Sequence, residues 1–271
     1  MYKLIALDMD GTLLTSDKRI SPRTKTAIER ARTKGVTVVL ASGRPIDGMQ
    51  AKLDELEICG ENEFVLYYNG SMVKHLGNDN KIIHQQIIDG ATTKQLTALA
   101  ADLGVYIHAF SQVHGLITPE LNPYTDIEAN INGLDITVMD FNTLEDDHPI
   151  IKAMFVAEPT VLTKAIAKLP PQWRESHTVV QSAPFFLEFL NPNSNKGVGV
   201  AAIANYLGIQ PDEVICVGDA ENDHHMIEYA GLGVAMANAM AETQALANHI
   251  TSSNDEDGVA EVIEQFILNN A

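Results

Sequence analysis

Residues 3–12 of this 271-residue chain read KLIALDMDGT, and the fold class can be argued outward from them. The first part, from Leu4 to Leu7, is continuously apolar, which is typical of a strand buried on both faces of a parallel sheet. The second part turns polar and carries two carboxylates, Asp8 and Asp10. Ligands of open α/β sheets bind beyond the carboxyl ends of the strands, so this strand end is the first candidate site.

Strands and helices alternate at both ends of the chain. Ser21-Pro22 predicts the start of a helix that ends at Gly35, and apolar runs predict strands over 36–41 and 64–68. The alternation resumes with predicted helices over 196–207, 223–230, 241–247 and 258–268 and predicted strands over 213–217, 233–236 and 249–252. Such crossovers predict an α/β fold with a Rossmann-like doubly wound parallel sheet.

The middle of the chain has a different pattern. Residues 72–86 predict a hairpin whose turn spans Gly77 to Asn80, and the strands that follow are shorter and partly alternating. Helical spacing occurs over 92–103 and 161–169, and strands are predicted over 105–118, 151–157, 178–181 and 185–190. We therefore predict a core domain of residues 1–85 and 189–271, interrupted by an inserted α+β domain of residues 86–188.

The chain is strongly acidic, with 18 Lys and Arg against 36 Asp and Glu and a formal net charge of −18. Nucleic acids and anionic membrane surfaces bind through an excess of basic residues, so neither is an expected partner. A hydrophobic content of 45% indicates a globular chain. The sequence shows no signal peptide and no apolar run of about 18 residues, which favours the cytoplasm. Cys59 and Cys216 are interpreted as reduced core thiols.

Four polar clusters follow predicted strands or open predicted helices, so they could converge on one crevice. The clusters are Asp8/Asp10/Thr12, Ser42/Gly43/Arg44, Lys196, and Asp219/Asn222/Asp223. Carboxylates gathered on one sheet edge repel one another unless a cation lies between them. A set of oxygen ligands without Cys or His suits Mg²⁺, which binds one or two carboxylates, waters and a substrate phosphate.

Each cluster taken alone also has a purely structural interpretation. Asp10-Gly11 could be a turn and Asp219 a helix cap, while Ser42-Gly43 is equally a strand-to-helix turn or an anion-binding loop. Lys196 opens a helix, where the macrodipole disfavours a cation, so it needs a carboxylate or phosphate partner unless it is solvated. Taken together, the four clusters favour a phosphate site.

In this order the clusters resemble the four motifs of the haloacid dehalogenase (HAD) superfamily of phosphohydrolases. The motifs are Asp8-Met9-Asp10-Gly11-Thr12, Ala41-Ser42-Gly43-Arg44-Pro45, Asn195-Lys196-Gly197 and Gly218-Asp219-Ala220-Glu221-Asn222-Asp223. The resemblance covers the whole chain, and the insertion between the second and third motifs has the placement of a type-two cap. Tyr68-Asn69-Gly70-Ser71 and Ser182-Ala183-Pro184 are similar to the Cof-type subfamily of sugar phosphatases.

The resemblance implies a role for each motif residue. Asp8 would be the nucleophile that forms an aspartyl phosphate, and Asp10 the general acid and base, for which we expect a raised pKa. Mg²⁺ would be bound by the Asp8 and Asp219 carboxylates and the Asp10 backbone carbonyl, with Asp223 just outside these ligands. The expected phosphate contacts are the Met9 amide, Ser42, Gly43, Lys196 and Asn222.

Residues outside these roles receive structural interpretations. Arg44 is interpreted as a brace for its loop, and His224-His225 as part of a partly exposed helix surface. Four residues of the predicted cap could shape a sugar pocket, although packing or exposure is the simpler interpretation for each: His108, His114, Tyr124 and Phe185.

The sequence therefore predicts a Mg²⁺-dependent phosphomonoesterase acting on small phosphorylated metabolites, with sugar phosphates the expected class and a cap that closes over the site. Two alternatives stay open: a phosphomutase using the same aspartyl phosphate, and a non-catalytic module that senses a phosphorylated ligand. Asp8 and Asp10 argue against the module, because phosphate binding needs neither carboxylate. The individual substrate and the oligomeric state stay open.

Overall fold

The computed structural model describes residues 1–77 and 80–269, so the predicted turn residues Asn78 and Asp79 lie outside the described part. The chain divides into two compact units, Met1–Gln85 with Asn195–Ala271, and Gln86–Ser194. The second predicted domain boundary, between residues 188 and 189, falls inside strand β11 (Phe186–Leu190). β11 pairs with strands of the second unit, so the chain returns to the first unit only at Asn195.

An eight-stranded sheet in the order β14-β13-β12-β1-β2-β3-β4-β5 forms the centre of the first unit. The six strands from β14 to β3 are parallel, and β3, β4 and β5 are antiparallel neighbours. The strands are β1 (Leu4–Asp8), β2 (Thr37–Ala41), β3 (Phe64–Tyr67), β4 (Met72–His75), β5 (Ile82–Gln85), β12 (Val214–Gly218), β13 (Leu232–Ala235) and β14 (His249–Ile250). The predicted α/β fold is confirmed.

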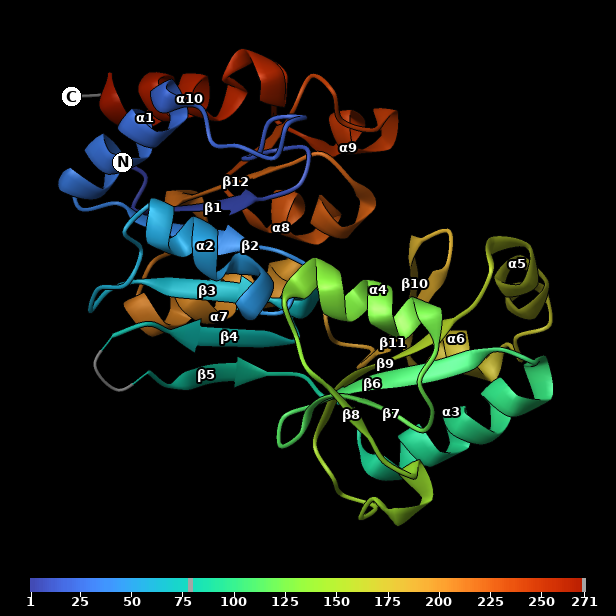
Figure 1. The fold of residues 1–271 in the computed structure, drawn as a ribbon. Helices are drawn as coiled ribbons and strands as arrows, with labels where there is room; N and C mark the ends of the chain where they lie inside the picture. Colours follow the sequence, from blue (N-terminus) through green and yellow to red (C-terminus); the bar gives the residue numbers. More distant parts are fainter. Residues whose placement is uncertain (78–79, 270–271) are drawn as a thin grey trace. The chain divides into compact units, whose positions relative to one another are not determined.

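Helices cover both faces of this sheet (Figure 1). On one face, Leu4 and Ala6 of β1 pack with Val200 and Ile203 of α7 and with Met226 of α8. Toward the other face, α1 and α10 lie side by side. The helices are α1 (Pro22–Thr33), α2 (Asp47–Glu55), α7 (Lys196–Leu207), α8 (His224–Tyr229), α9 (Ala241–Leu246) and α10 (Gly258–Ile263), which continues as a π-helix over Glu264–Leu268.

A six-stranded sheet in the order β10-β11-β9-β6-β7-β8 forms the second unit. Its strands are β6 (Tyr106–Ser111), β7 (Gly115–Thr118), β8 (Ile136–Val138), β9 (Ile150–Val156), β10 (Thr178–Ala183) and β11. Its helices are α3 (Gly90–Leu103), α4 (Pro123–Asn132), α5 (Pro159–Ala167) and α6 (Gln172–Ser176). One face of the sheet packs on an apolar core that includes Leu96, Phe155, Leu162 and Trp173.

The sequence interpretation missed helix α4, although the chain signals it. The Asn122 side chain caps the helix by accepting the amide of Thr125 at 2.9 Å, Pro123 occupies the first turn, and Gly133 ends the helix in a left-handed conformation. The interpretation of both cysteines as core thiols is wrong for Cys59, which is exposed, whereas Cys216 is buried in β12. Among the described residues no helix is long and apolar enough to cross a membrane.

A buried histidine makes the second unit sensitive to acid. His108 of β6 is fully buried, with Nδ1 3.0 Å from Thr125 Oγ1 and Nε2 3.2 Å from Met154 Sδ. Burial, assisted by the nearby Lys152 ammonium, lowers the pKa of His108 to about 3. The native imidazole therefore stays neutral at pH values where the unfolded chain takes up a proton.

We expect His108→Asn to remove this acid sensitivity. The wild-type unfolding free energy should fall relative to the variant's by about 1.4 kcal/mol per pH unit below the ordinary histidine pKa of about 6.5, because only the unfolded chain binds the proton. Between about pH 7.5 and about pH 5.0 the difference should reach about 2 kcal/mol in urea denaturation. The exposed His225→Asn serves as the control, and equal pH dependence of wild type and His108→Asn would contradict the assignment.

Candidate functional site

Asp8, the first predicted site residue, lies at the point where the order of the parallel strands reverses. The chain continues from β1 to β2 on one side and reaches β12 on the other only after the second unit, so β1 and β12 flank the topological switch point. Asp8 is the last residue of β1 and lies beside Ala41 of β2, while the preceding Leu7 lies beside Val217 of β12. The strand ends therefore bring Asp8, Ser42 and Asp219 to the same edge.

A buried lysine connects two of the predicted carboxylates. Lys196 Nζ lies 2.5 Å from Asp8 Oδ1 and 2.6 Å from Asp223 Oδ1, and the Lys196 side chain has no exposed surface. The other Asp223 oxygen accepts the amides of Asp219 and Ala220 at 2.9 and 3.1 Å. The alternative of a solvated Lys196 is therefore wrong, because two carboxylates offset the unfavourable position of its charge at a helix start.

Three carboxylates form a group that could hold a metal ion. Asp8, Asp219 and Asp223 each offer an oxygen, and these oxygens lie within 4.8 Å of one another. Burial, and next the Asp223 carboxylate, raise the pKa of Asp8. Burial also raises the pKa of Asp219, where a hydrogen bond from Thr12 opposes the shift and the Asp223 carboxylate adds to it. Crowded carboxylates with raised pKa values and only oxygen ligands fit a hard divalent cation.

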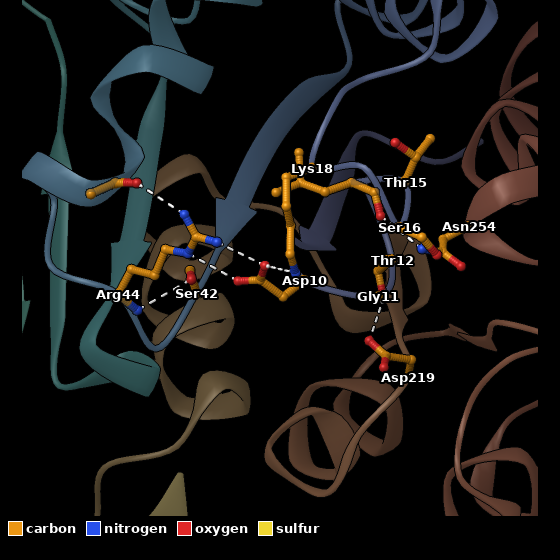
Figure 2. Close-up of polar contacts among 12 residues, drawn as sticks. Asp10, Gly11, Thr12, Thr15, Ser16, Lys18, Ser42, Arg44, Asp219 and Asn254 are labelled. Carbon is orange, nitrogen blue, oxygen red and sulfur yellow. Dashed lines mark hydrogen bonds and ion pairs between the residues drawn. The ribbon is translucent and has the colours of Figure 1, made fainter. Parts of the chain in front are cut away.

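Gly11 lets the loop after β1 approach Asp219 closely. Its φ angle is +88°, a left-handed conformation, and a Cβ atom there would lie 2.5 Å from Asp219 Oδ2. Thr12 Oγ1 donates to Asp219 Oδ1 at 2.9 Å, as Figure 2 shows. The loop after β1 therefore fixes the position of the Asp219 carboxylate, which follows the end of β12.

Asp10 is separated from this buried group and held by two basic side chains (Figure 2). Arg44 donates from Nε and Nη2 to its two oxygens at 2.9 and 2.7 Å, and Lys18 Nζ lies 2.8 Å from Oδ1. Partial burial acts to raise the pKa of Asp10, but the contacts with Arg44 and Lys18 lower it overall. The expected raised pKa is therefore wrong. Arg44 braces Asp10 and also joins its loop to the following helix, because its Nη1 contacts the carbonyl of Gly48 in the first turn of α2.

The remaining predicted phosphate contacts surround the same strand ends. Met9 is fully buried between Asp8 and Asp10, and its carbonyl accepts the amide of Leu14. Ser42 is buried directly after β2. Asn222 Nδ2 donates to Asn69 Oδ1 at 3.0 Å. Sequence reasoning quoted Asn69 only within a subfamily pattern and assigned it no role, although its position two residues after the end of β3 was a signal that could have found it.

The proposed pocket residues of the predicted cap separate into two places. His108, Tyr124 and Phe185 form a chain of neighbouring rings through Phe186, with successive ring centroids 4.6 to 6.2 Å apart. His114 instead stacks on His148 at 5.4 Å. His108 is buried, which agrees with the simpler interpretation of this residue as part of the packing.

The four motifs have a counterpart in known proteins. The sequence pattern of the haloacid dehalogenase-like hydrolases matches residues 5–263. The chain belongs to this family. A HAD-like hydrolase from Bacteroides thetaiotaomicron, solved by crystallography, has 33% sequence identity and a TM-score of 0.86, over 97% of this chain and 99% of that one.

Two curated relatives of this HAD-like hydrolase come from Bacillus subtilis. "Putative phosphatase YxeH" is 38% identical over 99% of both chains. "5-amino-6-(5-phospho-D-ribitylamino)uracil phosphatase YitU" is 29% identical over 97% of both chains. The family and these relatives support phosphatase activity, the hydrolysis of a phosphate ester.

Proposed function

We propose that this HAD-like hydrolase is a Mg²⁺-dependent phosphomonoesterase of small phosphorylated metabolites, acting through an aspartyl phosphate on Asp8. One observation carries the proposal: the Asp8 carboxylate is buried at the switch point, with Lys196 on one oxygen and further carboxylates beside it. A buried carboxylate that ends a strand is fixed in direction and poorly hydrated, which suits a nucleophile.

In the first step an Asp8 oxygen attacks phosphorus, and the bond from phosphorus to the leaving oxygen breaks. Lys196, already bonded to Asp8, would carry positive charge next to the phosphoryl oxygens, and the Met9 amide, Ser42, Gly43 and Asn222 would donate hydrogen bonds to them. In the second step water attacks the aspartyl phosphate, releasing phosphate and restoring the Asp8 carboxylate.

Asp10 would move the protons in both steps. It protonates the leaving alkoxide first and then accepts a proton from the attacking water. The contacts with Arg44 and Lys18 keep Asp10 ionised, which favours the second step and opposes the first. We therefore infer that these contacts loosen before the leaving group is protonated.

The donor set fits Mg²⁺, which when bound stabilises negative charge on the phosphoryl oxygens. The Asp8 and Asp219 carboxylates and the Asp10 backbone carbonyl would hold the ion. Asp223 would stay outside these ligands, because Lys196 occupies one of its oxygens and the amides of Asp219 and Ala220 occupy the other.

The substrate class is proposed from the chemistry of the family. YitU is named for a phosphate ester on a ribityl chain, which is a sugar-alcohol phosphate. A sugar or sugar-alcohol phosphate offers hydroxyl groups for recognition and a single phosphate for the site. We propose this class, in the cytoplasm, with no nucleic acid or membrane as partner.

Metal removal tests the proposal directly. We expect release of inorganic phosphate from p-nitrophenyl phosphate and from a panel of sugar phosphates in Mg²⁺, and a loss of at least about 100-fold after chelation, recovered by added Mg²⁺. Full activity in chelator would contradict the metal's role. Conversion of a hexose 1-phosphate to the 6-phosphate without free phosphate would instead identify a phosphomutase, and no turnover of any ester would favour the sensing module.

A further inference from the structure

Asn69 joins two of the proposed phosphate-binding segments. We propose that it is a positioning residue that orients the Asn222 amide and the loop at Gly43 toward the phosphoryl group. This inference rests on the proposed function, in which Asn222 and Gly43 contact phosphate. Asn69 itself lies in the short 3-10 segment Tyr68–Gly70 that follows β3.

The backbone ties this segment to the loop after β2. The Asn69 amide donates to the Ser42 carbonyl at 2.9 Å, and the Tyr68 amide donates to the Arg44 carbonyl at 3.0 Å. Asn69 adopts the left-handed conformation, with φ 55° and ψ 34°, which asparagine tolerates better than most residues. The backbone therefore brings the Asn69 side chain next to the loop whatever that side chain is.

The side chain makes a second, separate set of contacts. Asn69 Oδ1 accepts from Asn222 Nδ2 at 3.0 Å, across 153 positions of sequence. A Cβ atom at Gly43 would lie 3.0 Å from both Nδ2 and Oδ1 of Asn69, so the amide packs directly against that glycine. The side-chain amide of Asn69 therefore lies between Asn222 and the loop at Gly43.

The hydrogen bond determines which way the Asn222 amide faces. An amide nitrogen has two hydrogens, and Asn69 takes one, so the other is left for a second acceptor such as a phosphoryl oxygen. Without the Asn69 acceptor, the Asn222 amide is free to rotate or flip and presents its donor for only part of the time. The role is therefore indirect, through Asn222 and Gly43.

The substitution Asn69→Gly isolates the side chain, because glycine adopts the left-handed conformation without strain. We expect KM for p-nitrophenyl phosphate and the inhibition constant of inorganic phosphate to rise about five- to tenfold, with kcat changed less than twofold, since one orienting hydrogen bond is lost. Glu57→Gly is the matched control, at an exposed position with φ 56°, and should leave both constants unchanged.

A double-mutant cycle with Asn222→Ala then separates positioning from packing. If Asn69 acts through Asn222, Asn69→Gly should raise the phosphate inhibition constant by less than twofold in the Asn222→Ala background. The proposal would be overturned if Asn69→Gly raised the phosphate inhibition constant by the same factor in the Asn222→Ala background as in the wild type. A fall in kcat with unchanged KM and a lower melting temperature would also overturn it, because that pattern reports loss of folded protein.

The same question can be asked without turnover. If the wild type hydrolyses no ester, the proposed function fails, and calorimetric binding of inorganic phosphate to the Mg²⁺-loaded protein replaces kinetics. Equal weakening of phosphate binding in Asn69→Gly and Asn222→Ala would then support the positioning role. Unchanged binding in Asn69→Gly would overturn it.

Discussion

Replacing Asp8 by asparagine is expected to lower kcat/KM by about 10⁴-fold or more, since loss of a nucleophile removes the covalent step. The same substitution should leave the melting temperature unchanged or raise it. Burial, and next the Asp223 carboxylate, raise the pKa of Asp8 despite the opposing contact with Lys196, so the negative charge of Asp8 destabilises the folded protein. A neutral amide relieves that destabilisation, and Lys196 keeps Asp223 as its buried partner. Loss of activity without loss of stability would distinguish a nucleophile from a residue that only supports the fold.

Steady-state kinetics on p-nitrophenyl phosphate and thermal melting measure the two effects. Acid quenching of a reaction with phosphate-labelled substrate should also trap label on the wild type and none on Asp8→Asn. Asp17→Asn is the control, because Asp17 lies in the loop after β1 with 76% of its side chain exposed. Activity of Asp8→Asn within about 100-fold of wild type would rule out Asp8 as the nucleophile.

Replacing Lys196 by methionine is expected to have the largest effect on stability. The Lys196 side chain is completely buried, and the substitution would leave Asp8 and Asp223 together without their cation. Burial acts to lower the pKa of Lys196, but Asp223 and Asp8 raise it overall. The two carboxylates therefore stabilise the charged form of Lys196 by more than burial destabilises it. Removing one partner of a buried ion pair costs about 3–5 kcal/mol, and activity should be lost as well.

Urea denaturation without metal measures this loss. Lys25→Met is the control, because Lys25 is exposed on α1 of the same unit, and it should change the unfolding free energy by less than about 0.5 kcal/mol. Adding Asp223→Asn to Lys196→Met should recover part of the unfolding free energy, because it removes one of the two buried carboxylates that have lost their cation. Equal stability of Lys196→Met and Lys25→Met would show that the ion pairs contribute nothing.

Sequence reasoning worked where the signal is local. Buried parallel strands form continuous apolar runs, and helix starts such as Ser21-Pro22 carry capping chemistry, with the Ser21 hydroxyl accepting the amide of Thr24 at 3.1 Å. The same kind of signal, overlooked at Asn122-Pro123, would have predicted α4. The second domain boundary, predicted between residues 188 and 189, cuts the strand predicted over 185–190, and the pairing of β11 with β9 and β10 places that whole strand in the second unit.

The residues of the four motifs and their order resemble the HAD superfamily, and this resemblance predicted the family. The meeting of strand ends at one edge of a doubly wound sheet predicted only that the four motifs converge there. Contacts within that edge depend on three-dimensional proximity instead. Lys196 reaches Asp8 across 188 positions, and Asn69 reaches Asn222 across 153. The pKa of Asp10 is lowered by partners whose geometry no spacing rule encodes. Local patterns therefore determine which residues arrive at the site, whereas burial and distance, set by the folded chain, determine their charge and their partners.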